Sequence, residues 1–200
     1  MYYFSSPEQT SCLFDFYKFY NPLSNSIISK IETLTENIKY EKGKTQISTF
    51  TDEEDSARRS YVKWIPIHPK TLGLFNLLSN YITISNNEFW NFELISSSES
   101  IQYTEYRNTD KGHYTWHQDL LSKTVNRKLS LVIQLSDPDE YEGGELQISI
   151  PKAEKNEIIT VPKKKGYVVV FPSYLFHRVT PVTKGLRKSL VWWVGGVQFK

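Results

Sequence analysis

The sequence predicts a mostly β fold of the α+β class, in which helices from the first half of the chain pack on one face of a sandwich or jelly roll. Two observations support this prediction. Two segments in the first half carry apolar residues at helical spacing, and the second half is a series of short segments rich in aromatic and β-branched residues. Turn-forming runs such as "DPDEYEGG" and "PKKKG" separate these short segments.

Two helices are expected before residue 90. The first begins after Pro22, and its apolar face is formed by Ile27, Ile28, Ile31, Leu34 and Ile38. The second begins after Pro69, and its apolar face is formed by Leu74, Leu77, Leu78, Tyr81 and Ile82. Between them, the segment "RRSYVKWIPI" (58–67) predicts a strand.

Nine further strands are expected in the second half of the chain. Their ranges are 92–95, 100–106, 113–119, 127–136, 145–150, 157–161, 166–172, 175–180 and 187–199. Gly143 and Gly144 follow an acidic run, and we expect them to be turn residues at positive φ. This number of strands behind two helices favours a sandwich or jelly roll.

The composition limits the class of protein. We expect one domain over residues 1–200, with N-terminal helices and supporting strands in 1–98 and a jelly-roll core carrying the functional site in 99–200. A net charge of +2 gives no basic face that would demand nucleic acid. Cys12 is the only cysteine, which excludes an internal disulfide, and no apolar run approaches the ~20 residues of a membrane span. We therefore expect a cytoplasmic protein without a membrane partner.

Three residues predict a metal site. His117 and Asp119 lie two positions apart in "HYTWHQD", so on a strand their side chains share one face, with α-carbons about 6.6 Å apart. His177, on a later predicted strand, supplies a third donor. Two histidines and one carboxylate occupy one face of an octahedral metal and leave three positions open, as in non-haem Fe(II) oxygenases.

Arg187 follows His177 by ten residues and adds a cation to this predicted site. The three open metal positions suit a 2-oxo acid, which fills two of them as a chelate, and O₂, which takes the third. A guanidinium pairs with a distal carboxylate through two parallel hydrogen bonds. We therefore expect Arg187 to anchor the far end of such a co-substrate.

Three segments in this order resemble a known family. They are "YRNTDKGHYTWHQD", "LSDPDEYEGGEL" and "GYVVVFPSYLFHRVTPVTKGLRKSLVWWV". They resemble the Fe(II)/2-oxoglutarate dioxygenases of the prolyl 4-hydroxylase-like branch, especially the compact PKHD-type hydroxylases encoded by bacteria and tailed phages. The resemblance covers about residues 99–196 and implies a double-stranded β-helix core, which is a cupin-like jelly roll.

The resemblance implies Fe(II), O₂ and the co-substrate 2-oxoglutarate, with ascorbate as reductant. By position, it implies that iron is bound by His117, Asp119 and His177, and that Arg187 binds the distal carboxylate of 2-oxoglutarate. If the chain is encoded by a phage, its location is the cytoplasm of the host cell.

Two further residues are expected at the 2-oxoglutarate site. Tyr106 corresponds to a tyrosine that supports the distal carboxylate in related enzymes. Animal oxygen-sensing relatives have a second tyrosine where Ile133 lies, so we expect a different pocket, in which Ser189 supplies a hydroxyl.

The expected activity is hydroxylation of a C–H bond with release of succinate and CO₂, and the expected substrate is a prolyl residue in a peptide or protein. A set of aromatic residues suits the docking of such a segment: Tyr103, Tyr114, Trp116, Tyr141 and Tyr174. Three alternatives stay open. They are a free amino acid as substrate, oxidative demethylation of nucleic acid on the same fold, and a non-catalytic metal-binding jelly-roll module.

Overall fold

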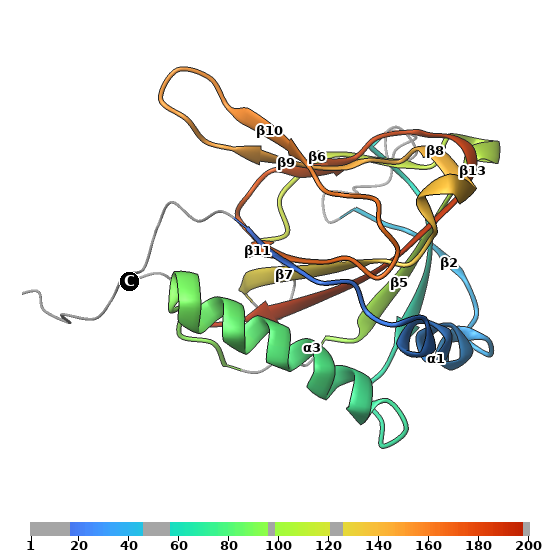
Figure 1. The fold of residues 1–200 in the computed structure, drawn as a ribbon, viewed down its shortest axis with the longest axis horizontal. Helices are drawn as coiled ribbons and strands as arrows, with labels where there is room; N and C mark the ends of the chain where they lie inside the picture. Colours follow the sequence, from blue (N-terminus) through green and yellow to red (C-terminus); the bar gives the residue numbers. More distant parts are fainter. Residues whose placement is uncertain (1–16, 46–56, 96–98, 121–125, 198–200) are drawn as a thin grey trace, which may run out of the picture.

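The computed structural model describes residues 17–45, 57–95, 99–120 and 126–197. These residues form three layers, which are visible in Figure 1: a smaller β-sheet, a larger β-sheet below it, and two helices on the outer face of the larger sheet. The described strands pair in an antiparallel manner throughout. The predicted jelly roll with helices on one face is therefore confirmed.

The larger sheet has the strand order β1-β11-β7-β13-β5-β4-β2, with β8 paired to β13. Its strands are β1 (Lys18–Tyr20), β2 (Glu41–Lys42), β4 (Tyr61–Ile65), β5 (Ile101–Arg107), β7 (Arg127–Gln134), β8 (Tyr141–Gly143), β11 (Val168–Pro172) and β13 (Val182–Gly195). The long strand β13 lies between β5 and β7, so residues from three strands meet in the middle of this sheet.

The smaller sheet has the strand order β10-β9-β12-β6-β3. Its strands are β3 (Arg58–Arg59), β6 (His113–His117), β9 (Leu146–Ile150), β10 (Glu157–Thr160) and β12 (His177–Val179). Along the chain, strands of this smaller sheet are preceded and followed by strands of the larger sheet. The two sheets therefore enclose a common interior.

Along the central strands, successive side chains point to opposite faces of the larger sheet, so one face packs under the helices and the other faces the smaller sheet. On β7, Leu129, Leu131 and Ile133 belong to the core under the helices. Ser130, Val132 and Gln134 lie at the intervening positions and face the smaller sheet. The core between the sheets includes Tyr106, Val132, Ile148, Val169 and Phe171. The polar residues Ser130 and Gln134 of this inner face are therefore buried between the sheets.

The helices α1 (Asn25–Thr35) and α3 (Leu72–Ser85) form where the apolar spacing predicts them. The side chain of Ser24 caps α1 by accepting a hydrogen bond from the N–H of Ile27. A π-helical turn, Asn86–Trp90, follows α3, and the side chain of Asn86 bonds both the N–H and the carbonyl of Phe92 as the chain leaves this turn. Since the helices pack on the same core as the later strands, we propose that 1–200 acts as one domain.

Most strand predictions are confirmed. The last predicted strand, 187–199, corresponds to β13, which begins five residues earlier and ends at Gly195; residues 198 and 199 lie outside the described residues. Three other differences are larger. The predicted strand 58–67 forms two strands, β3 and β4, which belong to different sheets. The predicted strand 92–95 is wrong, because only Leu94 forms a bridge there, with Gly196. The short strands β1, β2 and β8 were not predicted, since two or three residues carry too little pattern to indicate a strand.

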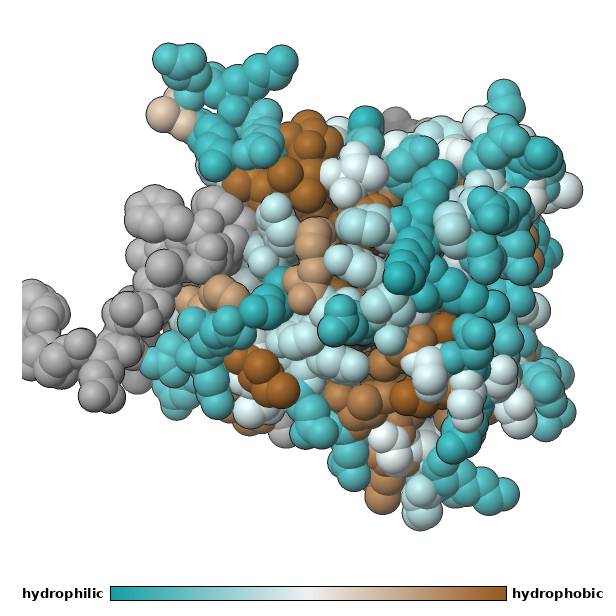
Figure 2. All heavy atoms as spheres, viewed as in Figure 1, coloured by the Kyte–Doolittle hydropathy of each residue, from teal (hydrophilic) through white to brown (hydrophobic). Residues whose placement is uncertain are grey.

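The surface is mixed in character. On the face in Figure 2, hydrophobic residues gather where the β9–β10 hairpin joins the rest of the molecule and along the helices, with hydrophilic residues between them. Among the described residues, no helix has the length and apolar character needed to cross a membrane.

Candidate metal and 2-oxo acid site

His117 and His177 meet across two neighbouring strands of the smaller sheet. His117 is the last residue of β6 and His177 is the first residue of β12, and the two are register partners. Asp119 lies two residues beyond β6, where its N–H donates to the carbonyl of Ser173 at 2.9 Å. Backbone hydrogen bonds thereby hold His117, Asp119 and His177 close together in space, although His177 is far from the other two in the sequence.

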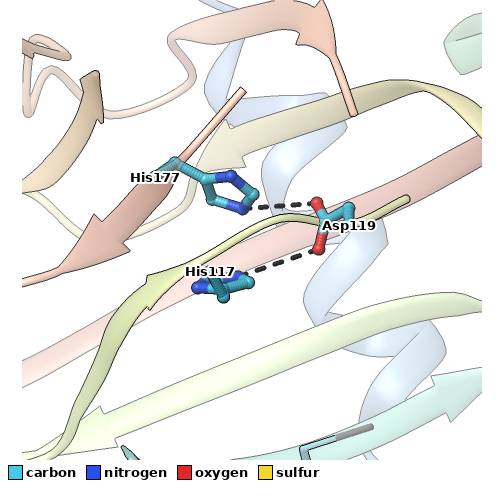
Figure 3. A group of neighbouring side chains, drawn as sticks. All are labelled: His117, Asp119 and His177. Carbon is cyan, nitrogen blue, oxygen red and sulfur yellow. Dashed lines mark ion pairs between the residues drawn. The ribbon is translucent and has the colours of Figure 1, made fainter. Parts of the chain in front are cut away.

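The three side chains point toward one another, as Figure 3 shows. The Nε2 atom of His177 lies 3.3 Å from Oδ2 of Asp119, and the Nε2 atom of His117 lies 3.7 Å from Oδ1. One ligand atom from each residue lies within 4.8 Å of the others. This separation allows a single ion to contact all three, so the predicted His-x-Asp and distal His set is brought together.

The outer nitrogen of each imidazole is held by the backbone. Nδ1 of His117 donates to the carbonyl of Thr115 at 2.8 Å, and Nδ1 of His177 donates to the carbonyl of Leu175 at 2.9 Å. With the proton on Nδ1, the lone pair of Nε2 points to the shared centre, which is the tautomer that a metal requires.

A bulge in β6 directs His117 into the interior. Between the register pairs Tyr114↔Val179 and His117↔His177, β6 advances three residues while β12 advances two. The additional residue places Tyr114 and His117 on one face, although an odd spacing normally separates them. Their rings consequently stack, with centroids 3.4 Å apart and an interplanar angle of 14°.

The larger sheet holds the carboxylate from the other side. The hydroxyl of Ser130, on the inner face of β7, donates to Oδ2 of Asp119 at 2.8 Å and lies 2.9 Å from the hydroxyl of Ser173. Sequence reasoning missed both serines, because serine is too common for its position to indicate such a role. They fix the orientation of the carboxylate between the two imidazoles.

The protonation of the cluster suits a cation. Burial, together with the neighbouring His177, lowers the pKa of His117 to about 3, so this ring is neutral near pH 7. Burial opposes ionisation of Asp119, but its contacts with His177 and His117 outweigh this effect and hold its pKa well below the usual range. Burial likewise acts to lower the pKa of His177, and the charge of Asp119 and its hydrogen bond outweigh it and raise that pKa. A metal bound at Nε2 of His177 would compete with protonation of that nitrogen.

Arg187 lies on the same inner face, nearer the other end of β7. It is 1% exposed, and its guanidinium donates to the hydroxyl of Ser189 at 3.2 Å and to the side-chain carbonyl of Gln134 at 2.9 Å. Its Cζ lies 5.3 Å from the centroid of the Tyr106 ring. Arg187 is the register partner of Tyr106, and Ser189 is that of Gln134, so cross-strand pairing assembles these four side chains.

Unpaired polar atoms surround this arginine. Nε of Arg187, Nε2 of Gln134 and the hydroxyl of Tyr141 are buried without a hydrogen-bond partner among the described residues. No carboxylate in the described part of the chain forms an ion pair with Arg187. A buried cation with neutral neighbours and free donors is costly unless an anion binds there, so these residues fit a carboxylate ligand.

One strand connects the two centres. Ser130 contacts Asp119, and Gln134, four residues farther along the same face of β7, contacts Arg187. Their α-carbons are about 13 Å apart at the rise of a strand. The metal cluster and Arg187 thus lie along one inner face of the larger sheet, an arrangement compatible with a dicarboxylate such as 2-oxoglutarate that binds a metal at one end and Arg187 at the other.

Ile133 does not line the pocket around Arg187. It faces the helices, whereas the adjacent Gln134 faces Arg187, because neighbouring residues on a strand point to opposite faces. Tyr141 was missed as a neighbour of Arg187; burial raises its pKa, so it is a neutral hydroxyl.

The predicted aromatic surround is only partly present. Tyr103 is buried in the core under the helices, and Tyr141 is buried beside Arg187. Trp116 lies on the outer face of the smaller sheet, where its ring contacts Arg178. Tyr114 stacks on His117, and the carbonyl of Tyr174 accepts a hydrogen bond from Gln118. Only these last two are adjacent to the metal cluster.

Gly144 provides a test of the arginine pocket. Its φ is +60°, and an added Cβ would lie 2.9 Å from Cγ2 of Val182 and 3.0 Å from Cδ of Arg187. Gly144→Ala is expected to lower the free energy of unfolding by about 1–3 kcal/mol, measured by urea denaturation, and to weaken 2-oxoglutarate binding. Gly73→Ala is the matched control, because Gly73 lies in α3 with open space around the added Cβ. We expect this control to raise stability by about 0.4–1 kcal/mol; equal losses in both variants would contradict the prediction.

Comparisons with known proteins agree with this geometry. Residues 101–195 match the model of the 2OG-Fe(II) oxygenase superfamily. A PKHD-type hydroxylase of Synechococcus sp. (strain CC9605) is 34% identical over 125 residues, which cover 62% of this chain and 54% of that protein. The chain thus spans about half the length of this curated relative. This relative and the PKHD-type hydroxylases of Shewanella frigidimarina and Acidovorax ebreus are bacterial, and they give no support to the suggested phage origin.

Solved structures share the fold at low sequence identity. A prolyl hydroxylase from Trichoplax adhaerens, in complex with a hypoxia inducible factor peptide fragment, has a TM-score of 0.70 at 14% identity, covering 90% of this chain and 83% of that one. A Pseudomonas putida prolyl-4-hydroxylase has a TM-score of 0.64 at 17% identity, covering 91% and 93%. Over residues 101–195, this chain is thus similar to the 2OG-Fe(II) oxygenase superfamily.

Proposed function

We propose that this chain is an Fe(II)- and 2-oxoglutarate-dependent dioxygenase that hydroxylates a prolyl residue in a peptide or protein. In this reaction one atom of O₂ enters the substrate as a hydroxyl group, and the other enters succinate as 2-oxoglutarate loses CO₂. The observation that carries the proposal is that a His, Asp and His cluster and the buried Arg187 lie on one inner face, where no carboxylate of the described residues pairs with Arg187.

Each residue has a separate task in this proposal. His117, Asp119 and His177 would hold Fe(II), which supplies the redox chemistry that activates O₂. Arg187 would bind the distal carboxylate of 2-oxoglutarate, while Tyr106 and Ser189 line its pocket. The apolar inner core excludes water from the reacting centre.

Two considerations support a prolyl substrate. The neighbours by fold include a prolyl hydroxylase seen with a peptide fragment and a bacterial prolyl-4-hydroxylase. The net charge of +2 also provides little attraction for a phosphate backbone, which makes nucleic acid a weaker candidate. Free proline remains an alternative, because a pocket that closes over a prolyl ring could accept the amino acid itself.

We further propose that ascorbate supports turnover and that the protein works in the cytoplasm. Ascorbate would keep the ion divalent between turnovers. The lone Cys12 is compatible with a reducing compartment.

A substrate panel tests the proposal. The iron-loaded protein, with ascorbate and 2-oxoglutarate, is offered proline-containing peptides, free proline and methylated single-stranded DNA at equal concentration. We expect peptides to stimulate succinate release most and to gain one oxygen atom by mass spectrometry. Stimulation by the oligonucleotide alone would assign a demethylase. Bound metal without any succinate would leave a non-catalytic module.

A further inference from the structure

Arg58 lies in the interior beside the metal cluster. As part of the run "TDEEDSARR", it could have belonged to an exposed charged loop, but its side chain is only 8% exposed. It is a residue of β3, the edge strand of the smaller sheet, and its register partner on β6 is Tyr114. Directly opposed residues of a sheet share one face, so both side chains project to the interior.

The contacts of Arg58 are those of a group held in one orientation. Its Nε donates to the hydroxyl of Ser60 at 2.8 Å and its Nη1 donates to the carbonyl of Lys44 at 3.1 Å. Its Nη2 is buried without a hydrogen-bond partner, and no carboxylate among the described residues pairs with it. The lack of a side chain at Gly43 leaves room for the guanidinium of Arg58, because a Cβ at residue 43 would lie 2.7 Å from Nε of Arg58.

The guanidinium is instead placed over an aromatic ring. Its Cζ lies 4.7 Å from the centroid of Tyr114, within the range of a cation–π contact. The same ring stacks on the imidazole of His117, with 3.4 Å between centroids. Tyr114 therefore links Arg58 to a metal-ligating side chain.

His117 needs such support more than the other two members of the cluster. It is the most exposed of the three, and among the described residues its ring makes one hydrogen bond, from Nδ1 to the carbonyl of Thr115. That bond fixes the tautomer but allows the ring to tilt about it. Asp119 is held by Ser130 and by its own backbone N–H, and His177 lies against Phe171 with centroids 4.9 Å apart.

We propose that Arg58 and Tyr114 are positioning residues that hold the His117 imidazole at the angle required for metal binding, through a guanidinium–phenol–imidazole stack. The inference rests on the proposed metal site. It assigns the β3 edge strand a role in metal affinity, separate from any contact with substrate. Partners of metal ligands commonly contribute tenfold to a hundredfold in metal affinity.

The test measures Co(II) binding to the full chain, because the visible absorption of Co(II) reports both its affinity and the geometry of its ligands. Tyr114→Leu, which removes the ring, is expected to weaken Co(II) binding about tenfold to a hundredfold and to change the absorption spectrum. Tyr114→Phe keeps the ring and is expected to restore wild-type affinity and spectrum. Arg58→Lys keeps the charge but loses the planar group, and we expect roughly threefold to tenfold weaker binding.

Arg59→Lys is the matched control, since Arg59 is the exposed neighbour on the same strand, and it should leave Co(II) binding unchanged. Circular dichroism establishes that each variant is folded; if Arg58→Lys does not fold, the comparison of Tyr114→Leu with Tyr114→Phe decides. Folded Tyr114→Leu with the wild-type affinity and spectrum overturns the inference while the metal site stands. Failure of the unchanged protein to bind Co(II) overturns the proposed function and the inference together.

Discussion

Replacing His177 by alanine is expected to abolish metal-dependent consumption of 2-oxoglutarate. The variant retains only two donors, His117 and Asp119, and leaves the carboxylate without its nearer imidazole at 3.3 Å. Partners outside the ligand set already contribute tenfold to a hundredfold in affinity, so loss of a ligand should exceed about a hundredfold. Equilibrium dialysis with Fe(II) under anaerobic conditions measures the binding, and succinate release measures the turnover.

The control separates this effect from the general loss of a histidine. His68→Ala removes a histidine outside the metal cluster, next to the start of α3, and should keep both metal binding and turnover. Circular dichroism should show that His177→Ala remains folded, because the surrounding strands are held by backbone hydrogen bonds. A folded His177→Ala protein with wild-type Fe(II) affinity would remove His177 from the ligand set.

Much of this centre could be predicted from the sequence, because its chemistry depends on rare residue types at fixed spacing. The chain has four histidines, and three of them, His113, His117 and His177, fall in the segments that resemble the family. His117, Asp119 and His177 were predicted as a cluster, and the structure brings them together. Helices α1 and α3 could be predicted equally well from the sequence, because each has an apolar face with the period of a helix.

What could not be predicted depends on three-dimensional pairing. Gln134 and Ile133 are adjacent, and only the register of β7 against β13 determines which of them faces Arg187. Arg58 occurs in a highly charged run, and its burial arises from the pairing of β3 with β6. Ser130 carries no sequence signal, because its role comes from the approach of two sheets. In each case a long-range contact decides the environment of a residue whose type alone indicates little.

Replacing Arg187 by methionine is expected to weaken 2-oxoglutarate binding tenfold to a hundredfold. The change removes a charge-assisted contact that contributes about 1.5–3 kcal/mol, which corresponds to this loss of affinity. Lysine at this position should recover only part of it, because a point charge replaces a planar fork. Gln134 and Tyr141 would remain as neutral groups that cannot balance a carboxylate.

Thermal and chemical stability provide a readout of this loss that does not depend on turnover. At a concentration a hundred times its dissociation constant, 2-oxoglutarate should stabilise the metal-loaded protein by about 2.7 kcal/mol, and a hundredfold loss of affinity reduces this to about 0.4 kcal/mol. Without ligand, Arg187→Met should be as stable as the unchanged protein or more so, since an apolar side chain replaces a buried cation that has no carboxylate partner among the described residues.

Arg178→Met is the matched control for this experiment. Arg178 follows His177 directly, but its side chain lies on the outer face of the smaller sheet, bonded to Gln147 and stacked on Trp116. Its replacement should leave the stabilisation by 2-oxoglutarate unchanged. The opposite pattern, in which Arg178→Met loses this stabilisation and Arg187→Met keeps it, would move the carboxylate anchor out of the interior and onto the outer sheet face. The unpaired donors around Arg187 would then require another anion, because a buried guanidinium with neutral neighbours is stable only when a negative charge completes its hydrogen bonds.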